Sequence, residues 1–369
     1  MKQSRRLFAL HSWLGLIAGL FILVFFLTGA VIVFREELSL WENAHLWRVE
    51  PKGRRLPYDT LYERVSASVT DTYLYSFRNM PRTPEETIEM RIYEPSTERY
   101  GLLYANPYTG QVLGKTFDSL YDILLTLHYK FYLGRFGEFL AALFALALLG
   151  SVLSGLYVYR KSLLKVLLFR FRGRWTNWRT ISSNLHRILG VWGLIFNLVL
   201  ALSGFWMLKY TLDVKNHFSP SATEKPAPPP IIGASLDGAI RQTQAAFGGR
   251  VTSVSFPRQP DDVVQVYALS PDRNWLYGDY SSYAEFESAT GRLLKVFRES
   301  DLSALERFEY ALYTLHFGQY GGLTIKLLYS FFSLAGAILT VTGFLLWYRR
   351  KRPKKQTRRP VPVVKQVQV

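Results

Sequence analysis

Four stretches without a single Asp, Glu, Lys or Arg constrain the fold most strongly, because each is long enough to cross a membrane. They cover 13–34, 139–159, 188–208 and 327–348, each 21 or 22 residues long. About 20 helical residues span the hydrocarbon core of a bilayer. We therefore expect an integral membrane protein, mainly α-helical, with a four-helix transmembrane core and α+β modules on its outer side.

The distribution of charge orients these spans. The net charge is +17, yet residues 1–6, 160–187 and 349–369 together hold 20 of the 45 Lys and Arg and no acidic residue. Basic residues concentrate in cytoplasmic flanks, so we expect a bacterial inner-membrane protein with both termini in the cytoplasm. The first apolar run is too long for a signal peptide, which favours an uncleaved anchor. The basic runs then meet the lipid bilayer, and we expect no nucleic acid partner.

The chain matches itself in two tandem halves. Residues 11–15 (HSWLG) align with 186–190 (HRILG) at an offset of 175, and Leu127-His128 aligns with Leu315-His316 at an offset of 188. Ser/Thr-Gly pairs recur in all four spans, as Thr28-Gly29, Ser154-Gly155, Ser203-Gly204 and Thr342-Gly343. Because both halves have the same orientation, we expect a pseudo-twofold axis along the membrane normal.

Each half is expected to contain a span, an outer module, an interfacial helix and a returning span. Each outer module reads as one helix followed by four short strands, and a stiff Pro-rich linker at 225–230 sets the second module apart from its span. The expected segments are a first span (7–34), module (35–118), interfacial helix (119–136), second span (137–159), basic inner loop (160–185), third span (186–208), second module (209–300), interfacial helix (301–322), fourth span (323–348) and basic tail (349–369).

Histidine placement is the most informative chemistry. The chain has no cysteine, so thiolate metal sites and covalently attached c-type haem are excluded. Four of the six histidines form repeat-matched pairs, His11 with His186 at the inner span ends and His128 with His316 at the outer ones. A twofold axis brings each pair face to face, as bis-histidine ligation of two b-type haems requires. His45 and His217 lie in polar loop sequence and are expected at the surface, with a third ligand pair as the alternative reading.

Glycines and arginines supply further candidate cofactor-binding residues. Glycines follow each inner histidine on its own helix face, at Gly15 and Gly19 in one half and at Gly190 and Gly193 in the other. They leave room for a flat macrocycle, although close helix packing is the alternative reading. Arg187 on the inner side and Arg135 on the outer side are candidate partners for haem propionates; ordinary membrane flanking is their alternative reading.

The H-x-x-L-G starts, the Leu-His motifs, the Ser/Thr-Gly pairs and the paired outer modules resemble the PepSY-associated transmembrane proteins, over about residues 5–350. Within that family the chain is most similar to inner-membrane siderophore-iron reductases. The resemblance implies a di-haem core, with a PepSY-like module in each periplasmic segment, that reduces ferric siderophore in the periplasm. Some members are fused to a flavin reductase domain; here we expect a separate cytoplasmic electron donor, a flavin reductase or reduced flavin, and a monomeric chain.

The acceptor side is less constrained by the sequence. Six tyrosines of the outer modules could pack a siderophore or simply cover a sheet: Tyr93, Tyr100, Tyr104, Tyr277, Tyr280 and Tyr283. The near-neutral charge of the modules would not repel a neutral or cationic ferric chelate. Two other functions remain open, a quinol-linked cytochrome b and a haem-free membrane anchor or regulator.

Overall fold

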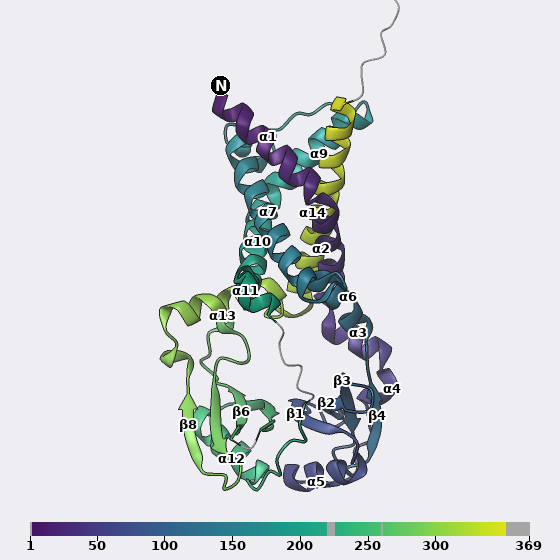
Figure 1. The fold of residues 1–369 in the computed structure, drawn as a ribbon, viewed down its shortest axis with the longest axis vertical. Helices are drawn as coiled ribbons and strands as arrows, with labels where there is room; N and C mark the ends of the chain where they lie inside the picture. The colour runs from purple at the N-terminus through teal and green to yellow at the C-terminus, as the bar shows by residue number, and fades with distance from the viewer. Residues whose placement is uncertain (1, 220–225, 260, 352–369) are drawn as a thin grey trace, which may run out of the picture.

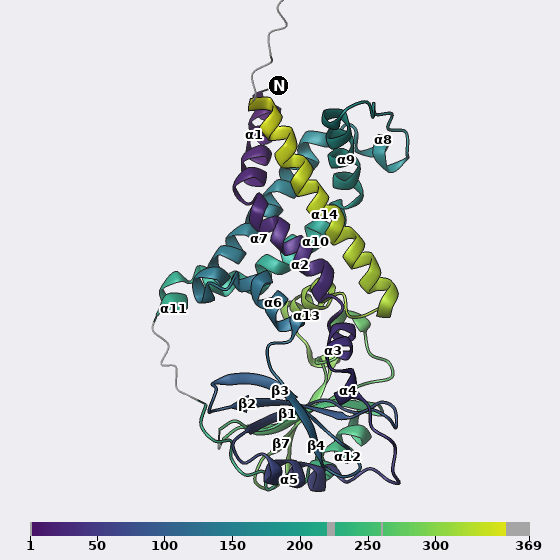
Figure 2. The same ribbon diagram turned by 90° about the vertical axis from the view of Figure 1, so that its right-hand side faces the viewer.

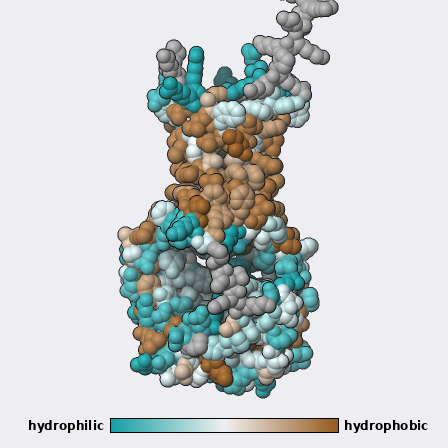
Figure 3. Space-filling view, viewed as in Figure 1, coloured by the Kyte–Doolittle hydropathy of each residue, from teal (hydrophilic) through white to brown (hydrophobic). Residues whose placement is uncertain are grey.

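The chain has a tall helical part and an outer β-sheet (Figures 1 and 2). The computed structural model describes residues 2–219, 226–259 and 261–351. Most of the expected basic tail and Lys225 of the expected linker lie outside these residues. A band of apolar side chains covers the helical part, with polar surfaces above and below it (Figure 3). This banding is typical of a chain that crosses a membrane once per long helix.

The two halves of the helical part contain matching elements. The first half has α1 (Lys2–Ile17), α2 (Gly19–Ile32), α6 (Leu120–Lys130) and α7 (Gly134–Tyr159). The second has α9 (Trp178–Trp192), α10 (Leu194–Leu208), α13 (Ala304–Phe317) and α14 (Gly322–Lys351). Shorter helices connect them: α3 (Arg35–Glu42), α4 (Ala44–Trp47), α8 (Leu163–Leu167), α11 (Val214–Phe218) and the 3₁₀ turn Lys209–Leu212.

The expectation of a four-helix transmembrane core is wrong. Within the described residues, three helices are long and apolar enough to cross a membrane, at Gly134–Tyr159, Leu194–Leu212 and Gly322–Arg350. The expected first span is instead a helix pair, Gln3–Ile17 and Gly19–Ile32, bent by 65°. A fourth crossing exists only if this bent pair counts as one span.

The bend lies where glycines weaken the helix. Glycine at positions 15 and 19 reduces the preference for continuous helix on both sides of Ala18. Arg5 and Arg6 on the first turns keep the start of α1 at the polar surface. The break between α9 and α10 falls at Gly193, which is the position equivalent to Ala18 at the repeat offset of 175. The two halves are therefore broken at the same place.

The two expected outer modules share one sheet, because all eight strands form a single antiparallel sheet in the order β4-β3-β2-β1-β5-β6-β7-β8. The halves join where β1 pairs with β5, with Ser76 opposite Ser255 and Phe77 opposite Val254. Pairing these two edges satisfies backbone groups that two separate sheets would leave open. The strands are β1 (Tyr73–Asn79), β2 (Ile88–Glu94), β3 (Arg99–Ala105), β4 (Val112–Thr116), β5 (Arg250–Ser255), β6 (Val263–Leu269), β7 (Tyr283–Glu287) and β8 (Leu293–Phe297).

Two helices, α5 (Tyr58–Ser68) and α12 (Leu236–Phe247), cover the sheet face that points away from the helical part (Figure 1). Their apolar sides and alternate strand residues form one continuous core across both modules. The N-termini of the two helices bind each other. Asp237 accepts a hydrogen bond from the backbone N–H of Asp59 at 2.9 Å, and Asp59 accepts from Leu236 N–H at 2.5 Å. Each acidic side chain thus caps the partner helix.

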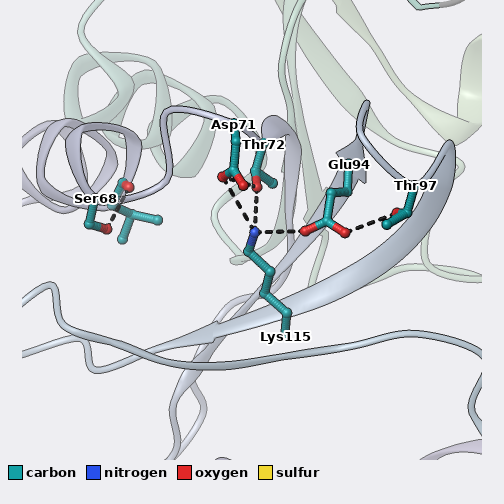
Figure 4. Close-up of polar contacts among 7 residues, drawn as sticks. Ser68, Asp71, Thr72, Glu94, Thr97 and Lys115 are labelled. Carbon is teal, nitrogen blue, oxygen red and sulfur yellow. Dashed lines mark hydrogen bonds and ion pairs between the residues drawn. The ribbon is translucent and has the colours of Figure 1, made fainter.

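The first half of the sheet is tied across its strands by Lys115 (Figure 4). The ammonium group of Lys115 on β4 donates to Thr72 Oγ1 at 2.6 Å and to Glu94 Oε1 at 3.0 Å. Hydrogen bonds from Lys115 and Thr97 hold the pKa of the Glu94 carboxyl below its usual range. The three residues link the ends of β1, β2 and β4.

Cysteine labelling tests the orientation of the two ends, since the natural chain contains no cysteine. Lys52 is exposed in the outer part, and Arg172 is exposed in the loop between α7 and α9. We expect a membrane-impermeant maleimide to label Lys52→Cys in intact spheroplasts and to label Arg172→Cys only after lysis. The reverse pattern would show that the basic segments face the periplasm.

Candidate functional site

The two inner histidines face each other at the crossing of the broken helices. His11 on α1 and His186 on α9 have ring centroids 6.1 Å apart, and their ring planes are inclined by 77°. Each comes from a different half of the chain, as the repeat predicts. The contact therefore lies on the boundary between the halves.

The two outer histidines form a second pair of the same geometry. His128 on α6 and His316 on α13 have ring centroids 6.3 Å apart and ring planes inclined by 67°. Both helices lie between the long spans and the sheet (Figure 1). The structure thus brings together all four histidines singled out by the repeat, two at each level.

Hydrogen bonds fix the tautomer of the inner pair. His11 Nδ1 lies 2.9 Å from the carbonyl oxygen of Ser151, and His186 Nδ1 lies 3.0 Å from that of Leu339. A carbonyl oxygen only accepts, so each Nδ1 carries the hydrogen. Each Nε2 is then left with a free lone pair.

In the outer pair, hydroxyl groups fix the same tautomer, with the hydrogen on Nδ1. Thr28 Oγ1 donates its hydrogen to the Val24 carbonyl at 2.6 Å, so it accepts from His128 Nδ1 at 2.8 Å. Ser203 Oγ likewise donates to Val199 O at 2.6 Å and accepts from His316 Nδ1 at 2.8 Å. Within the described part of the chain, no hydrogen bond engages the Nε2 atom of any of the four rings.

The Ser/Thr-Gly pairs hold the histidines, a role that the sequence analysis missed. A Cβ atom on the glycine of each pair would lie only 3.1 to 3.5 Å from the Cε1 atom of one histidine. The histidine that each pair holds belongs to the same half: Ser154-Gly155 holds His11, Thr28-Gly29 holds His128, Thr342-Gly343 holds His186 and Ser203-Gly204 holds His316. Their recurrence in all four spans was the available signal.

A cavity of about 360 Å³ opens beside the inner pair. Three predicted glycines, Gly15, Gly19 and Gly190, line it, and a Cβ atom on Gly15 would meet no atom within 4 Å. Most of the remaining lining is apolar. The cavity therefore has a glycine wall next to two imidazoles that present Nε2 lone pairs. In this wall Gly15 borders open space, whereas Gly19 and Gly190 pack against Thr340 and Leu339.

The other predicted site residues differ in their surroundings. Arg187 lines the cavity, and so does Arg350, which the sequence analysis did not single out. Gly193 lies at the break between α9 and α10, where its local role is to end one helix and begin the next. Arg135 donates its guanidinium hydrogens to the carbonyl oxygens of His217 and Ser219, at 3.2 and 2.7 Å. These bonds commit Arg135 to holding α11.

The two remaining histidines differ from each other. His45 is exposed, as expected. The side chain of His217 is only 5% exposed, and its Nε2 lies 2.8 Å from the carbonyl oxygen of Arg135. The expectation of a surface histidine is therefore wrong for His217. Its loop folds back against the start of α7, a contact that local polarity does not reveal.

The hydrogen bond to His316 can be tested by its energetic cost. Ser203→Ala leaves a buried imidazole N–H without its acceptor, which costs about 1–3 kcal/mol. We expect a lower midpoint of thermal unfolding in detergent at a fixed heating rate. Ser151→Ala is the matched control, because its buried hydroxyl has no hydrogen-bond partner among the described residues. Equal midpoints for the two variants would contradict the role assigned to Ser203.

Comparison with known proteins agrees with this architecture. An uncharacterized protein of Pseudomonas aeruginosa, PA4219, is 27% identical over 261 residues. The match covers 62% of this chain and 64% of the relative, so it spans just under two thirds of that protein's length. The model of the PepSY-associated TM region matches residues 8–350. The chain belongs to this family of membrane proteins.

Proposed function

We propose that the protein binds two haem b groups, one at each histidine pair, and is an oxidoreductase of the inner membrane. It takes electrons from a cytoplasmic donor, a flavin reductase or reduced flavin, and reduces ferric siderophore in the periplasm, releasing Fe(II). The observation that carries the proposal is the matched separation of the rings in the two histidine pairs.

Ring separation supports a shared metal at each level. Two imidazoles on opposite sides of one metal, each with a metal–nitrogen bond of about 2 Å, have centroids about 6 Å apart. The observed separations are 6.1 Å for the inner pair and 6.3 Å for the outer pair.

The orientation of the rings supports the same assignment. Metal-binding histidines usually donate their second N–H to a carbonyl, a hydroxyl or a carboxylate, which fixes the ring and its tautomer. All four Nδ1 atoms have such an acceptor, so all four Nε2 atoms are available as ligands.

The number of ligands favours a macrocycle over a bare metal ion. Within the described ranges no group of three or more His, Asp or Glu side chains could hold a metal ion. Two imidazoles suffice when four further ligands come with the metal, as in haem. The glycine wall of the inner cavity fits a flat ring, and Arg187 and Arg350 would hold its propionates.

Bound haem would supply one-electron transfer in the apolar core. The protein's own residues keep the two levels close together. Phe26 on α2 lines the inner cavity. The ring centroid of the adjacent Phe25 lies 5.4 Å from that of His128. The inner site and the outer pair thus meet at neighbouring residues of one helix.

The acceptor would bind between the helices and the sheet. The sheet face opposite α5 and α12, here called the open face, carries Tyr100 in the first module and Tyr267 and Tyr283 in the second; Tyr75 and Tyr93 on the same face are buried beside Tyr100. Tyr310 on α13 donates to the carbonyl of Tyr280 at 3.5 Å, which links the helix carrying His316 to this face. Figure 3 shows openings beneath the apolar band on this side.

Haem content provides the first test. We expect the purified protein to show a reduced b-type spectrum with two haems per chain, and His11→Ala to retain one, because an inner ligand is lost while the outer pair is intact. Gly15→Leu should also retain one, since its side chain fills the cavity. Ala9→Leu, on an exposed position of α1, is the control. A colourless protein would favour the haem-free anchor.

Sided vesicles provide the second test. We expect a membrane-impermeant ferric siderophore to oxidise pre-reduced protein only from the periplasmic face, with Fe(II) as product. His316→Ala should abolish this oxidation, because the outer pair loses a ligand. Oxidation from both faces would contradict the wiring, and dependence on a quinol as donor would favour the cytochrome b alternative.

A further inference from the structure

A small cavity lies at the seam between the two modules. It has a volume of about 30 Å³ and lies beside the pairing of β1 with β5. Its lining includes three arginines, Arg78, Arg82 and Arg250. Thr252, Asp279 and Tyr280 also line it. Residues of both modules line it, so the cavity belongs to neither module alone.

The carboxylates near this cavity are already paired. Arg78 is bound to Glu89 at 2.9 Å, and Asp279 is bound to Arg273. No salt bridge or side-chain hydrogen bond to the guanidinium groups of Arg82 and Arg250 is found in the described part of the chain. Three arginines and one aspartate line the cavity, and the charges of Asp279 and Glu86 act on Arg250 without forming an ion pair with it among the described residues.

Neighbouring arginines disfavour the charged form of Arg250 and of Arg91. Burial, followed by the charge of Arg82, holds the pKa of Arg250 below its usual range. Arg91 on the open face shows the same effect, from burial and then from the charges of Arg78 and Arg258. Like charges held together and partly removed from water are unfavourable unless an anion joins them.

The position of the cavity connects it with the proposed acceptor space. Tyr280 lines the cavity, and its ring is 5.2 Å from that of Tyr267 on the open face. The carbonyl of Tyr280 also accepts the hydrogen bond from Tyr310 on α13. A group bound by the arginines would therefore lie at the side of the space below the helix that carries His316.

We propose that Arg82 and Arg250, supported by Arg78, bind an acidic oxygen group of an anionic ferric chelate. Guanidinium groups suit carboxylate and phenolate oxygens, because their paired N–H donors match two oxygens. The cavity has room for one such group, so the rest of the chelate extends over the tyrosines of the open face. The identity of the ligand as an iron chelate rests on the proposed function; the binding does not require electron transfer.

This assignment differs from the expectation of a neutral or cationic chelate. That expectation used the summed charge of the modules, which is near zero. The sum conceals the local arrangement, because three arginines converge at the seam while Glu89 and Asp279 are each paired with an arginine.

Gallium(III) citrate tests the site without reduction, because Ga(III) has the charge of Fe(III) and is not reduced. We expect the full-length protein in detergent to bind it at low ionic strength, measured by calorimetry. The Arg82→Gln/Arg250→Gln double variant should raise the Kd at least about tenfold, since two charge-assisted contacts are lost. The cationic gallium(III) complex of desferrioxamine B should bind more weakly than the citrate complex.

Arg241→Gln is the matched control, an exposed arginine on α12 that covers the opposite face of the sheet. We expect its Kd to change less than about twofold. The inference is overturned by absence of citrate binding, by an unchanged Kd in the double variant, by an equal loss in Arg241→Gln, or by metal-free citrate binding as tightly as the chelate. Because Ga(III) is not reduced, binding would persist if the proposed reductase activity failed. Conversely, ferric citrate reduction with an unchanged KM in the double variant would remove this site and leave the reductase.

Discussion

The membrane part of the protein depends on buried imidazole N–H groups that must find acceptors away from water. Each of the four histidines meets this need with an oxygen of a neighbouring span, and a glycine in that span lets the ring approach. An unpaired N–H in this setting is costly, so the contacts fix both the ring orientation and the crossing of the helices. The same contacts leave the four Nε2 atoms without a hydrogen-bond partner among the described residues.

Support and pairing are divided between the halves. Each histidine is held by a span of its own half, whereas its imidazole partner comes from the other half. The outer sheet is divided in the same way. Each module has its own helix and strands, and the β1–β5 pairing and the mutual caps of Asp59 and Asp237 join the two modules. A ligand bridging either histidine pair would therefore clamp the halves together and stabilise the fold by mass action.

The open face shows why summed charge is a poor guide to a binding surface. Each salt bridge neutralises one acidic and one basic side chain, as Glu89 with Arg78 and Asp279 with Arg273 show. At the seam, three arginines and one aspartate line the cavity, which is the basis of the proposed anion site. Tyrosines beside it supply an apolar surface with polar edges, which suits a chelate with an acidic group and a less polar body.

The outer strands, the repeat and the four paired histidines could be predicted from the residues alone. Each outer module has the one helix and four strands that were expected, because alternation and turn residues act locally. Only the tertiary structure decided that the first span bends at Ala18, that two modules share one sheet, and that the Ser/Thr-Gly pairs hold histidines. These features depend on which groups meet across the fold. The edge strands and the imidazole N–H groups pair with residues far away in the sequence, and local sequence patterns do not identify these partners.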